Sequence, residues 1–202
     1  MKKIMFNDRY GLTQAVIEGR KTMTRRMISG SPLLPEDRIE EASICPDGFV
    51  SIIANGGESL MEVKYSYKVG EIVAVAQSYR DIGAECFETD ASILRAPELH
   101  RMAGWANKMF VKSELMPRRI RITGIKCERL QDISEADCLK EGLRQAYAES
   151  ILGMYGYIDH KGTGLWFNTP REAFAALIDK VSGKGKWALN PWVVAYEFEL
   201  VK

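Results

Sequence analysis

The residues best suited to chemistry lie in one short stretch, Gly19-Arg20-Lys21-Thr22-Met23-Thr24-Arg25-Arg26. It combines a hydroxyl group that can act as a nucleophile, a lysine that can act as a base, and arginines that can bind an anion. This combination favours chemistry or recognition at an anionic or polar ligand. The alternative is a solvated basic turn, because runs of charge are usually exposed to solvent.

The residues around this stretch predict how it is positioned. Asn7 or Asp8 can cap a helix whose apolar residues recur at helical spacing over 12–17. Gly19 would end that helix, and the β-branched residues after it favour an extended strand to about Ile28. The basic stretch is therefore expected at a junction between a helix and a strand.

The spacing within the stretch sets a geometric condition on any joint action of Lys21 and Thr24. Residues three positions apart on a straight strand point to opposite faces. The two side chains can meet only if the chain bends between them, which a turn after Gly19 would permit. A strand that is regular from Lys21 onward would exclude the pair.

Composition excludes several classes of protein. The chain has 202 residues, 46% of them hydrophobic, which suits a single domain with a buried core. The formal charge is only +1, but basic residues gather at 20–26 and 118–129 and acids at 132–141. The chain is not a polybasic binder, so any contact with nucleic acid is expected to be local.

The cysteines and histidines predict neither disulfides nor a metal site. The four cysteines have no paired spacing, and with two histidines no zinc pattern can be assembled. We therefore expect reduced thiols, no metal and no cofactor. The first residues contain a three-residue apolar run, too short for a signal peptide or a membrane span, so we expect a cytoplasmic protein.

The rest of the chain predicts mixed α and β structure. Apolar runs or alternation predict strands at 4–6, 72–76, 120–123 and 192–201 and a hairpin within 40–66. Ser134 and Thr169 each begin a capping pattern, which predicts a helix ending at Glu141 and a second helix from Pro170. Residues 80–110 have no clear period, and the glycines of 153–168 predict a mobile surface loop.

In order and in motif, these features resemble the ASCH domain family, which has a PUA-like β-barrel. The resemblance covers 4–28, 68–79, 116–143 and 187–201, and Asn190-Pro191-Trp192-Val193 is similar to the larger, bacteriophage-type members. It implies an α+β fold: one ASCH-like domain over 1–202, with a few peripheral helices and insertions at about 36–66, 80–115 and 145–168.

The family signature, Gly-x-Lys-x-x-Glu-x-Arg, matches at Gly19, Lys21 and Arg26, with Thr24 in place of its glutamate. A branch that has threonine there, the N4-acetylcytidine amidohydrolases, resembles this chain. Its catalytic lysine, threonine and glutamate fall on Lys21, Thr24 and Glu141. The match at Glu141 requires an ungapped alignment from Ser134.

The resemblance implies a metal-independent amidohydrolase that removes an acyl group from an N4-acylated cytidine-like base. Thr24 would be the nucleophile, Lys21 the base that takes its proton, and Glu141 the proton donor to the leaving amine. Burial or the neighbouring arginines would lower the pKa of Lys21. Arg26 would stabilise an oxyanion or hold a phosphate.

A wider set of residues is expected to bind a modified nucleoside or RNA. It consists of Gly19, Arg20, Arg25, Arg26, Gln77, Arg119 and Arg121. Tyr79, Trp105, Trp166 and Trp187 are candidates to stack on a base, although tryptophan is more often part of the core. Two alternatives to an enzyme remain: a non-catalytic RNA- or nucleotide-binding module, and a phage accessory protein that acts through protein contacts.

Overall fold

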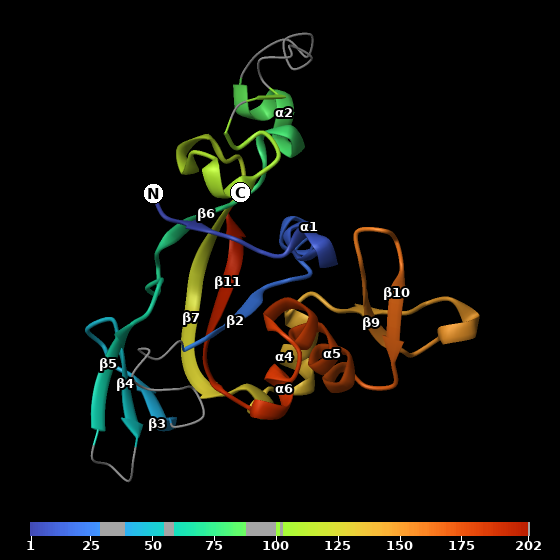
Figure 1. Ribbon diagram of the computed structural model, residues 1–202. Coiled ribbons are helices and arrows are strands. Elements are labelled where there is room, and N and C mark those ends of the chain that lie inside the picture. Colours follow the sequence, from blue (N-terminus) through green and yellow to red (C-terminus); the bar gives the residue numbers. More distant parts are fainter. Residues whose placement is uncertain (29–38, 55–58, 88–99, 102, 202) are drawn as a thin grey trace.

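The computed structural model describes residues 1–28, 39–54, 59–87, 100–101 and 103–201 (Figure 1). The strands are β1 (Lys3–Ile4), β2 (Met23–Met27), β3 (Ile39–Ile44), β4 (Phe49–Ala54), β5 (Ser59–Lys64), β6 (Ile72–Val75), β7 (Arg119–Arg129), β8 (Arg144–Gln145), β9 (Tyr155–Ile158), β10 (Gly164–Phe167) and β11 (Trp192–Val201). The α-helices are α1 (Leu12–Ile17), α2 (Tyr79–Phe87), α4 (Glu135–Lys140), α5 (Pro170–Ser182) and α6 (Lys186–Leu189). Short 3-10 turns are η1 (Asp8–Tyr10), η4 (Lys108–Phe110), η5 (Ser113–Leu115), η6 (Leu130–Asp132) and η7 (Glu149–Ile151). The predicted α+β class is confirmed.

A five-stranded sheet forms the centre of the molecule, in the order β1-β6-β7-β11-β2 (Figure 1). β1 and β6 run parallel, and the other neighbouring strands run antiparallel. The long pair of β7 and β11 carries an irregularity between Glu197 and Phe198. β2 lies at one edge of this sheet, and within the described residues the three sheets do not close into a barrel.

One large apolar core joins this sheet to the elements around it. It includes Ile4 from β1, Val75 from β6, Ile120 and Ile122 from β7, and Phe198 from β11. The predicted strands at 72–76, 120–123 and 192–201 are therefore confirmed as core strands, which explains their continuous or alternating apolar residues.

The two predicted helix starts are formed as the capping patterns indicate. The Ser134 hydroxyl accepts a hydrogen bond from the backbone NH of Asp137 (3.1 Å) and begins α4, which Glu141 caps at its other end. Thr169 accepts a bond from the NH of Glu172 (3.2 Å) and begins α5, with Pro170 in its first turn. Caps of this kind stabilise a helix by about 1 kcal/mol.

The predicted insertions hold local structure of their own. The predicted hairpin within 40–66 is a three-stranded antiparallel sheet, β3-β4-β5, whose last turn falls at 55–58, outside the described residues. α2 begins at Tyr79 and continues into 80–115, and η4 and η5 fall within that range. The prediction of a loop at 153–168 was wrong, because β9 and β10 pair there as an antiparallel hairpin next to β8.

Candidate active site

A cavity of about 430 Å³ lies where the basic stretch, the segment after β1, the end of α4 and the apolar face of α5 meet. Sites for small molecules in proteins are typically about 300–1,000 Å³. The side chains that carry charge or a hydroxyl group in its lining are those of Lys21, Thr24, Arg25, Arg26, Lys108, Glu141 and Ser182. The cavity is therefore large enough for a small ligand and is rich in cations.

Lys21 and Thr24 both line this cavity because the chain is not a regular strand between them. Lys21 forms an isolated antiparallel bridge with Glu141, and the backbone NH of Thr22 donates to the carbonyl oxygen of Lys140 (2.9 Å). β2 begins at Met23, and its pairing with β11 starts with the bond from the backbone NH of Phe198 to the carbonyl oxygen of Thr22 (2.8 Å). Lys21 and Thr24 thus line one cavity, as their joint action would require.

Lys21 is held in a buried ion pair. Its side chain is 2% exposed, and its ammonium group contacts the carboxylate of Glu141 at 2.5 Å and the carbonyl oxygen of Glu141 at 2.8 Å. Burial lowers the pKa of Lys21 below its ordinary value, and the negative charge of Glu141 only partly offsets this. Lys21 is thus closer to giving up its proton than an exposed lysine.

The carboxylate of Glu141 accepts hydrogen bonds from two cationic side chains. One of its carboxylate oxygens accepts from Lys21, and the other accepts from the guanidinium group of Arg25 at 2.9 Å. Gly142 follows in the left-handed region at φ +100°, and a Cβ there would come within 3.2 Å of the Lys21 side chain. Only glycine therefore suits this position, both for its backbone angle and for the close approach of Lys21.

Arg25 connects the pair to a wider buried network. Its side chain is 1% exposed and also contacts Glu128 at 2.7 Å and Asp137 at 3.4 Å. Burial alone would lower the pKa of Arg25, but the charges of Glu141 and Glu128 and hydrogen bonds to them raise it above its ordinary value. Glu128 and Asp137 were not predicted as site residues. Asp137 stood in the Ser134 capping pattern, and the position of Glu128 could be found only from the pairing of β7 with β11.

Thr24 is the buried residue of the cavity that is best placed to react. It is 5% exposed and lies opposite Tyr196 in the β2–β11 ladder. Within the described part of the chain, its hydroxyl group makes no hydrogen bond, whereas Lys21, Arg25 and Glu141 are all paired. The hydroxyl group is thus available to a ligand in the cavity.

The remaining wall is apolar. Phe6 and Leu12 face it from one side, and Phe174, Leu177 and Ile178 of α5 from the other. The ammonium group of Lys21 lies 5.8 Å from the ring centre of Phe6, and the guanidinium group of Arg25 lies 6.0 Å from that of Phe174. These surfaces keep water from the charged groups and offer a flat ligand apolar contact.

The other predicted site residues are placed unequally. Arg26 lines the cavity from its exposed rim, and its guanidinium group donates to the carbonyl oxygen of Met5 at 2.5 Å. Gly19, at φ +74°, turns the chain before Lys21. Arg20 points to a different cavity, where it bonds to the carbonyl oxygen of Gly142 (3.0 Å).

Besides Gly19 and Arg20, three more of the expected ligand-binding residues do not line this cavity. Arg119 and Arg121 are exposed on β7, and Arg121 pairs with Glu199 at 3.0 Å. Gln77 follows β6, and its side-chain oxygen is buried without a hydrogen-bond partner within the described residues. The structure thus brings together Lys21, Thr24, Arg25, Arg26 and Glu141, and leaves Arg119, Arg121 and Gln77 outside.

Comparisons with known proteins add no relative, because no family model, curated protein or solved structure matches the chain. Within the described residues, no group of three or more histidine, cysteine, aspartate or glutamate side chains is arranged to hold a metal ion. No described helix has the length and apolar character needed to cross a membrane. The site must therefore be interpreted from its own geometry.

Proposed function

We propose that the chain is an ASCH-type amidohydrolase with a PUA-like core, and that it removes the acyl group from an N4-acylated cytidine-like nucleoside. The observation that carries this proposal is that Lys21, Thr24 and Glu141 line one cavity, although 120 residues separate Lys21 from Glu141. The resemblance to the amidohydrolase branch points to these same three positions. Their convergence in a cavity of suitable size supports the assignment.

The reaction begins at Thr24. Neutral Lys21 takes the proton of the Thr24 hydroxyl group as its oxygen attacks the acyl carbon, giving a tetrahedral intermediate. The C–N bond to the base then breaks, and the departing exocyclic nitrogen takes a proton delivered by the Lys21–Glu141 pair. The acyl group remains on Thr24 as an ester, which water hydrolyses to release the carboxylic acid and restore the hydroxyl group.

The surroundings of these groups favour such a sequence. Burial lowers the pKa of Lys21, which increases the share of the neutral form that a base needs. Arg25 fixes the carboxylate of Glu141 from the side opposite Lys21. Arg26, on the rim, supplies a cation for the oxyanion that forms on the acyl oxygen.

One observation favours the second candidate, a binding module for a nucleoside or nucleotide without turnover. The Lys21 ammonium group is occupied by two oxygens of Glu141. For catalysis, the Lys21 amino group must break at least one of these hydrogen bonds and contact the Thr24 hydroxyl group instead. The two functions differ in one measurable respect, which is the release of deacylated cytidine.

The test is hydrolysis of N4-acetylcytidine by the purified protein, followed by chromatography of released cytidine. Thr24→Val keeps the shape of the side chain and removes the hydroxyl group, whereas Thr24→Ser keeps the hydroxyl group. We expect turnover by the parent protein and by Thr24→Ser, and a loss of at least about 100-fold in Thr24→Val.

The design separates chemistry from folding. Because the Thr24 hydroxyl group makes no hydrogen bond within the described residues, Thr24→Val should unfold at nearly the same denaturant concentration as the parent. Binding of N4-acetylcytidine by the parent without release of cytidine would establish the binding module instead. Equal turnover in Thr24→Val would remove Thr24 as the nucleophile.

A further inference from the structure

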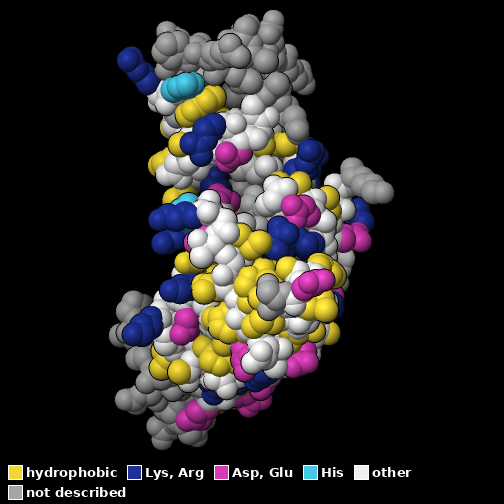
Figure 2. All heavy atoms as spheres, turned by 90° about the vertical axis from the view of Figure 1, so that its right-hand side faces the viewer, with side chains coloured by type: hydrophobic (Ala, Val, Ile, Leu, Met, Phe, Trp, Pro, Cys, Tyr) yellow, Lys and Arg dark blue, Asp and Glu magenta, His cyan; other side chains and the backbone are white. Residues whose placement is uncertain are grey.

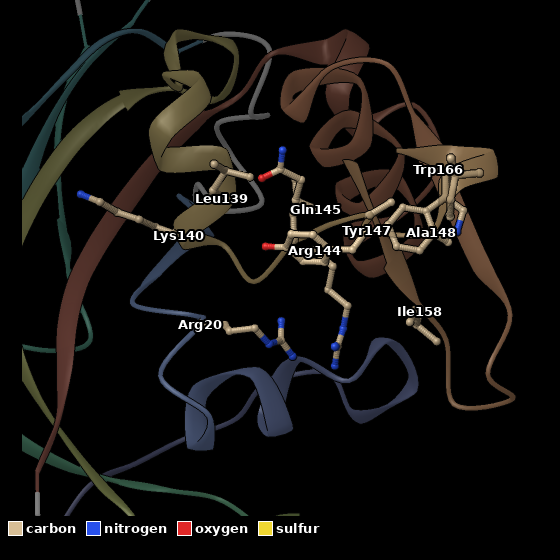
Figure 3. A pocket seen from close by; sticks show the side chains of 12 residues that line it. Arg20, Leu139, Lys140, Arg144, Gln145, Tyr147, Ala148, Ile158 and Trp166 are labelled. Carbon is tan, nitrogen blue, oxygen red and sulfur yellow. The ribbon is translucent and has the colours of Figure 1, made fainter. Parts of the chain in front are cut away.

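A second cavity, of about 580 Å³, is lined by neighbours of the catalytic residues (Figure 3). Arg20 precedes Lys21 and Lys140 precedes Glu141, so neighbouring residues on the two bridged segments line the two cavities. The other residues that line this second cavity come from the segment after α4 and from the hairpin of β9 and β10, and include Arg144, Tyr147, Ile158 and Trp166. None of these residues takes part in the proposed chemistry.

Trp166 forms a flat platform in this cavity because two glycines make room for its ring. Gly156 lies directly opposite Trp166 in the β9–β10 ladder, and Gly164 lies two residues before it on the same face. A Cβ on Gly156 would come within 1.9 Å of the carbonyl oxygen of Leu165 and within 2.9 Å of the indole ring, and a Cβ on Gly164 would come within 2.5 Å of the indole ring. The indole ring therefore lies close to the backbone of both glycines.

Arg144 stands on the same face of this small sheet. Gly156 pairs with Trp166 on one side and with Arg144 on the other, so the three residues form one row across β10, β9 and β8. Directly opposed residues point to the same face, and two strand spacings separate Trp166 from Arg144 by about 10 Å. An aromatic surface and a cation thus stand on either side of a position without a side chain.

Arg20 adds a second cation to this end of the cavity. The guanidinium groups of Arg20 and Arg144 point toward each other, whereas the ammonium group of Lys140 points away (Figure 3). Both arginines contact the same carboxylate oxygen of Glu18, at 2.7 and 3.8 Å. Two cations that share one carboxylate leave one positive charge for an anionic ligand.

The rest of the cavity surface is apolar and accessible. Tyr147, which lines the cavity next to the platform, is 84% exposed, and the lining also includes the apolar side chains of Leu139, Ile151 and Ile158. Figure 2 shows hydrophobic side chains gathered on the face that carries β9 and β10, with Lys and Arg side chains above them. Exposed apolar patches of this kind often mark binding sites.

We propose that this cavity binds a neighbouring nucleotide of a single-stranded RNA whose acylated base occupies the catalytic cavity. The base stacks on Trp166 and Tyr147, and the phosphate contacts Arg144 and Arg20. Flat aromatic surfaces beside cations are the usual means of holding single strands. The inference rests on the proposed function for the occupant of the first cavity, and it makes an RNA strand, rather than a free nucleoside, the preferred substrate.

The first experiment measures binding of fluorescein-labelled pentacytidylate RNA by anisotropy, with cytidine 5′-monophosphate as competitor. Trp166→Ala and Tyr147→Ala should each raise the Kd about tenfold. Arg144→Gln should reduce the slope of log Kd against log salt by about 0.7. Arg101→Gln makes the same chemical change at an exposed residue that lines neither cavity, and should bind as the parent does.

Two results overturn the proposal. One is pentacytidylate binding that is equal in the parent and in all three cavity variants. The other is binding of cytidine 5′-monophosphate as tight as that of the pentanucleotide, which would make the cavity a site for free nucleotides. Because Tyr147 is 84% exposed, a folding defect cannot account for an effect of Tyr147→Ala.

A second experiment separates this inference from the proposed function. It compares kcat/KM for N4-acetylcytidine as a nucleoside and at the centre of the pentanucleotide. We expect about tenfold preference for the strand, reduced in Trp166→Ala. Hydrolysis without preference would overturn the inference and leave the enzyme. Absence of hydrolysis, with binding that depends on Trp166 and Arg144, would overturn the enzyme and leave the RNA site.

Discussion

The two cavities next to the Lys21–Glu141 bridge differ in how far their charged side chains are buried and paired. In the first, Lys21, Arg25 and Glu141 are almost fully buried and each has an ionic partner. In the second, Arg20 and Arg144 keep 28% and 42% of their side chains exposed and share Glu18. In the first cavity the charged side chains are thus buried and paired, whereas in the second they are partly exposed and only partly paired.

The difference follows from the cost of removing charge from water. A buried charge must be compensated, so the first cavity can hold its ions only in a fixed arrangement, which is what proton transfer requires. An exposed arginine costs little and contributes little to folding, so the second cavity can present cations to a ligand. Substitutions should therefore have large effects on stability in the first cavity and small ones in the second.

The largest effect is expected from Glu141→Gln. This change leaves Lys21 buried without its carboxylate, and breaking a buried ion pair costs about 3–5 kcal/mol. Turnover of N4-acetylcytidine should fall by about 100- to 10,000-fold. Urea unfolding and chromatographic turnover measure the two effects.

Glu197→Gln is the matched control. It makes the same change in a carboxylate that is 45% exposed and pairs with Lys140 at 3.0 Å, so its effect should stay within about 1 kcal/mol. Equal destabilisation by the two substitutions would break the contrast between buried and exposed charge.

Arg25→Lys should have the next largest effect. A single ammonium group cannot reproduce the separate bonds from the guanidinium group to Glu141 and Glu128, so at least one buried carboxylate loses a donor. Loss of one bond to a charged group costs about 1.5–3 kcal/mol. Unfolding in urea should show this loss, and a stability equal to that of the parent would mean that Lys21 alone holds Glu141.

The pH dependence of stability tests the buried state of Lys21. The pKa of Lys21 in the folded protein lies below its ordinary value of 10.5. At a pH between these two pKa values, the unfolded chain binds more protons than the folded chain. This residue therefore adds a contribution to the unfolding free energy that rises with pH in that window, by at most about 1.4 kcal/mol per pH unit. Lys21→Met should abolish this contribution in urea titrations at a series of pH values, and identical slopes in both proteins would contradict it.

The smallest effect on stability is expected from Tyr147→Ala. The side chain is 84% exposed, so its removal should change the unfolding free energy by less than about 0.5 kcal/mol. The same protein should bind pentacytidylate more weakly than the parent does. A large loss of stability would show that the second cavity belongs to the core, and the contrast between the cavities would disappear.

Sequence patterns predicted the elements whose signals are local. The capping pattern at Thr169 predicted α5, and the apolar residues of 192–201 predicted β11. The positions of Lys21, Thr24 and Glu141 came from a motif, and their convergence could only be stated as a condition. Whether the condition is met depends on the bond between Thr22 and Lys140, which joins segments that no sequence pattern connects.

The hairpin at 155–167 shows where local patterns misled. Glycines usually indicate loops, and here they predicted one. Two of them, Gly156 and Gly164, instead leave space for the indole of Trp166 within paired strands. Likewise, the role of Arg25 as the centre of a carboxylate network depends on Glu128 and Asp137, which come from different elements.

α4, which carries Glu141 at its end, also contains Cys138, whose side chain is fully buried and whose thiol pKa is raised by burial to about 12. A thiol so protected reacts with an alkylating reagent only when α4 leaves its place against β2 and α5. The rate of its modification therefore measures how often α4, which Glu141 caps at its end, moves out of its packed position. Slow modification in the parent and faster modification in Glu141→Gln would express the strength of the ion pair as the frequency of that movement.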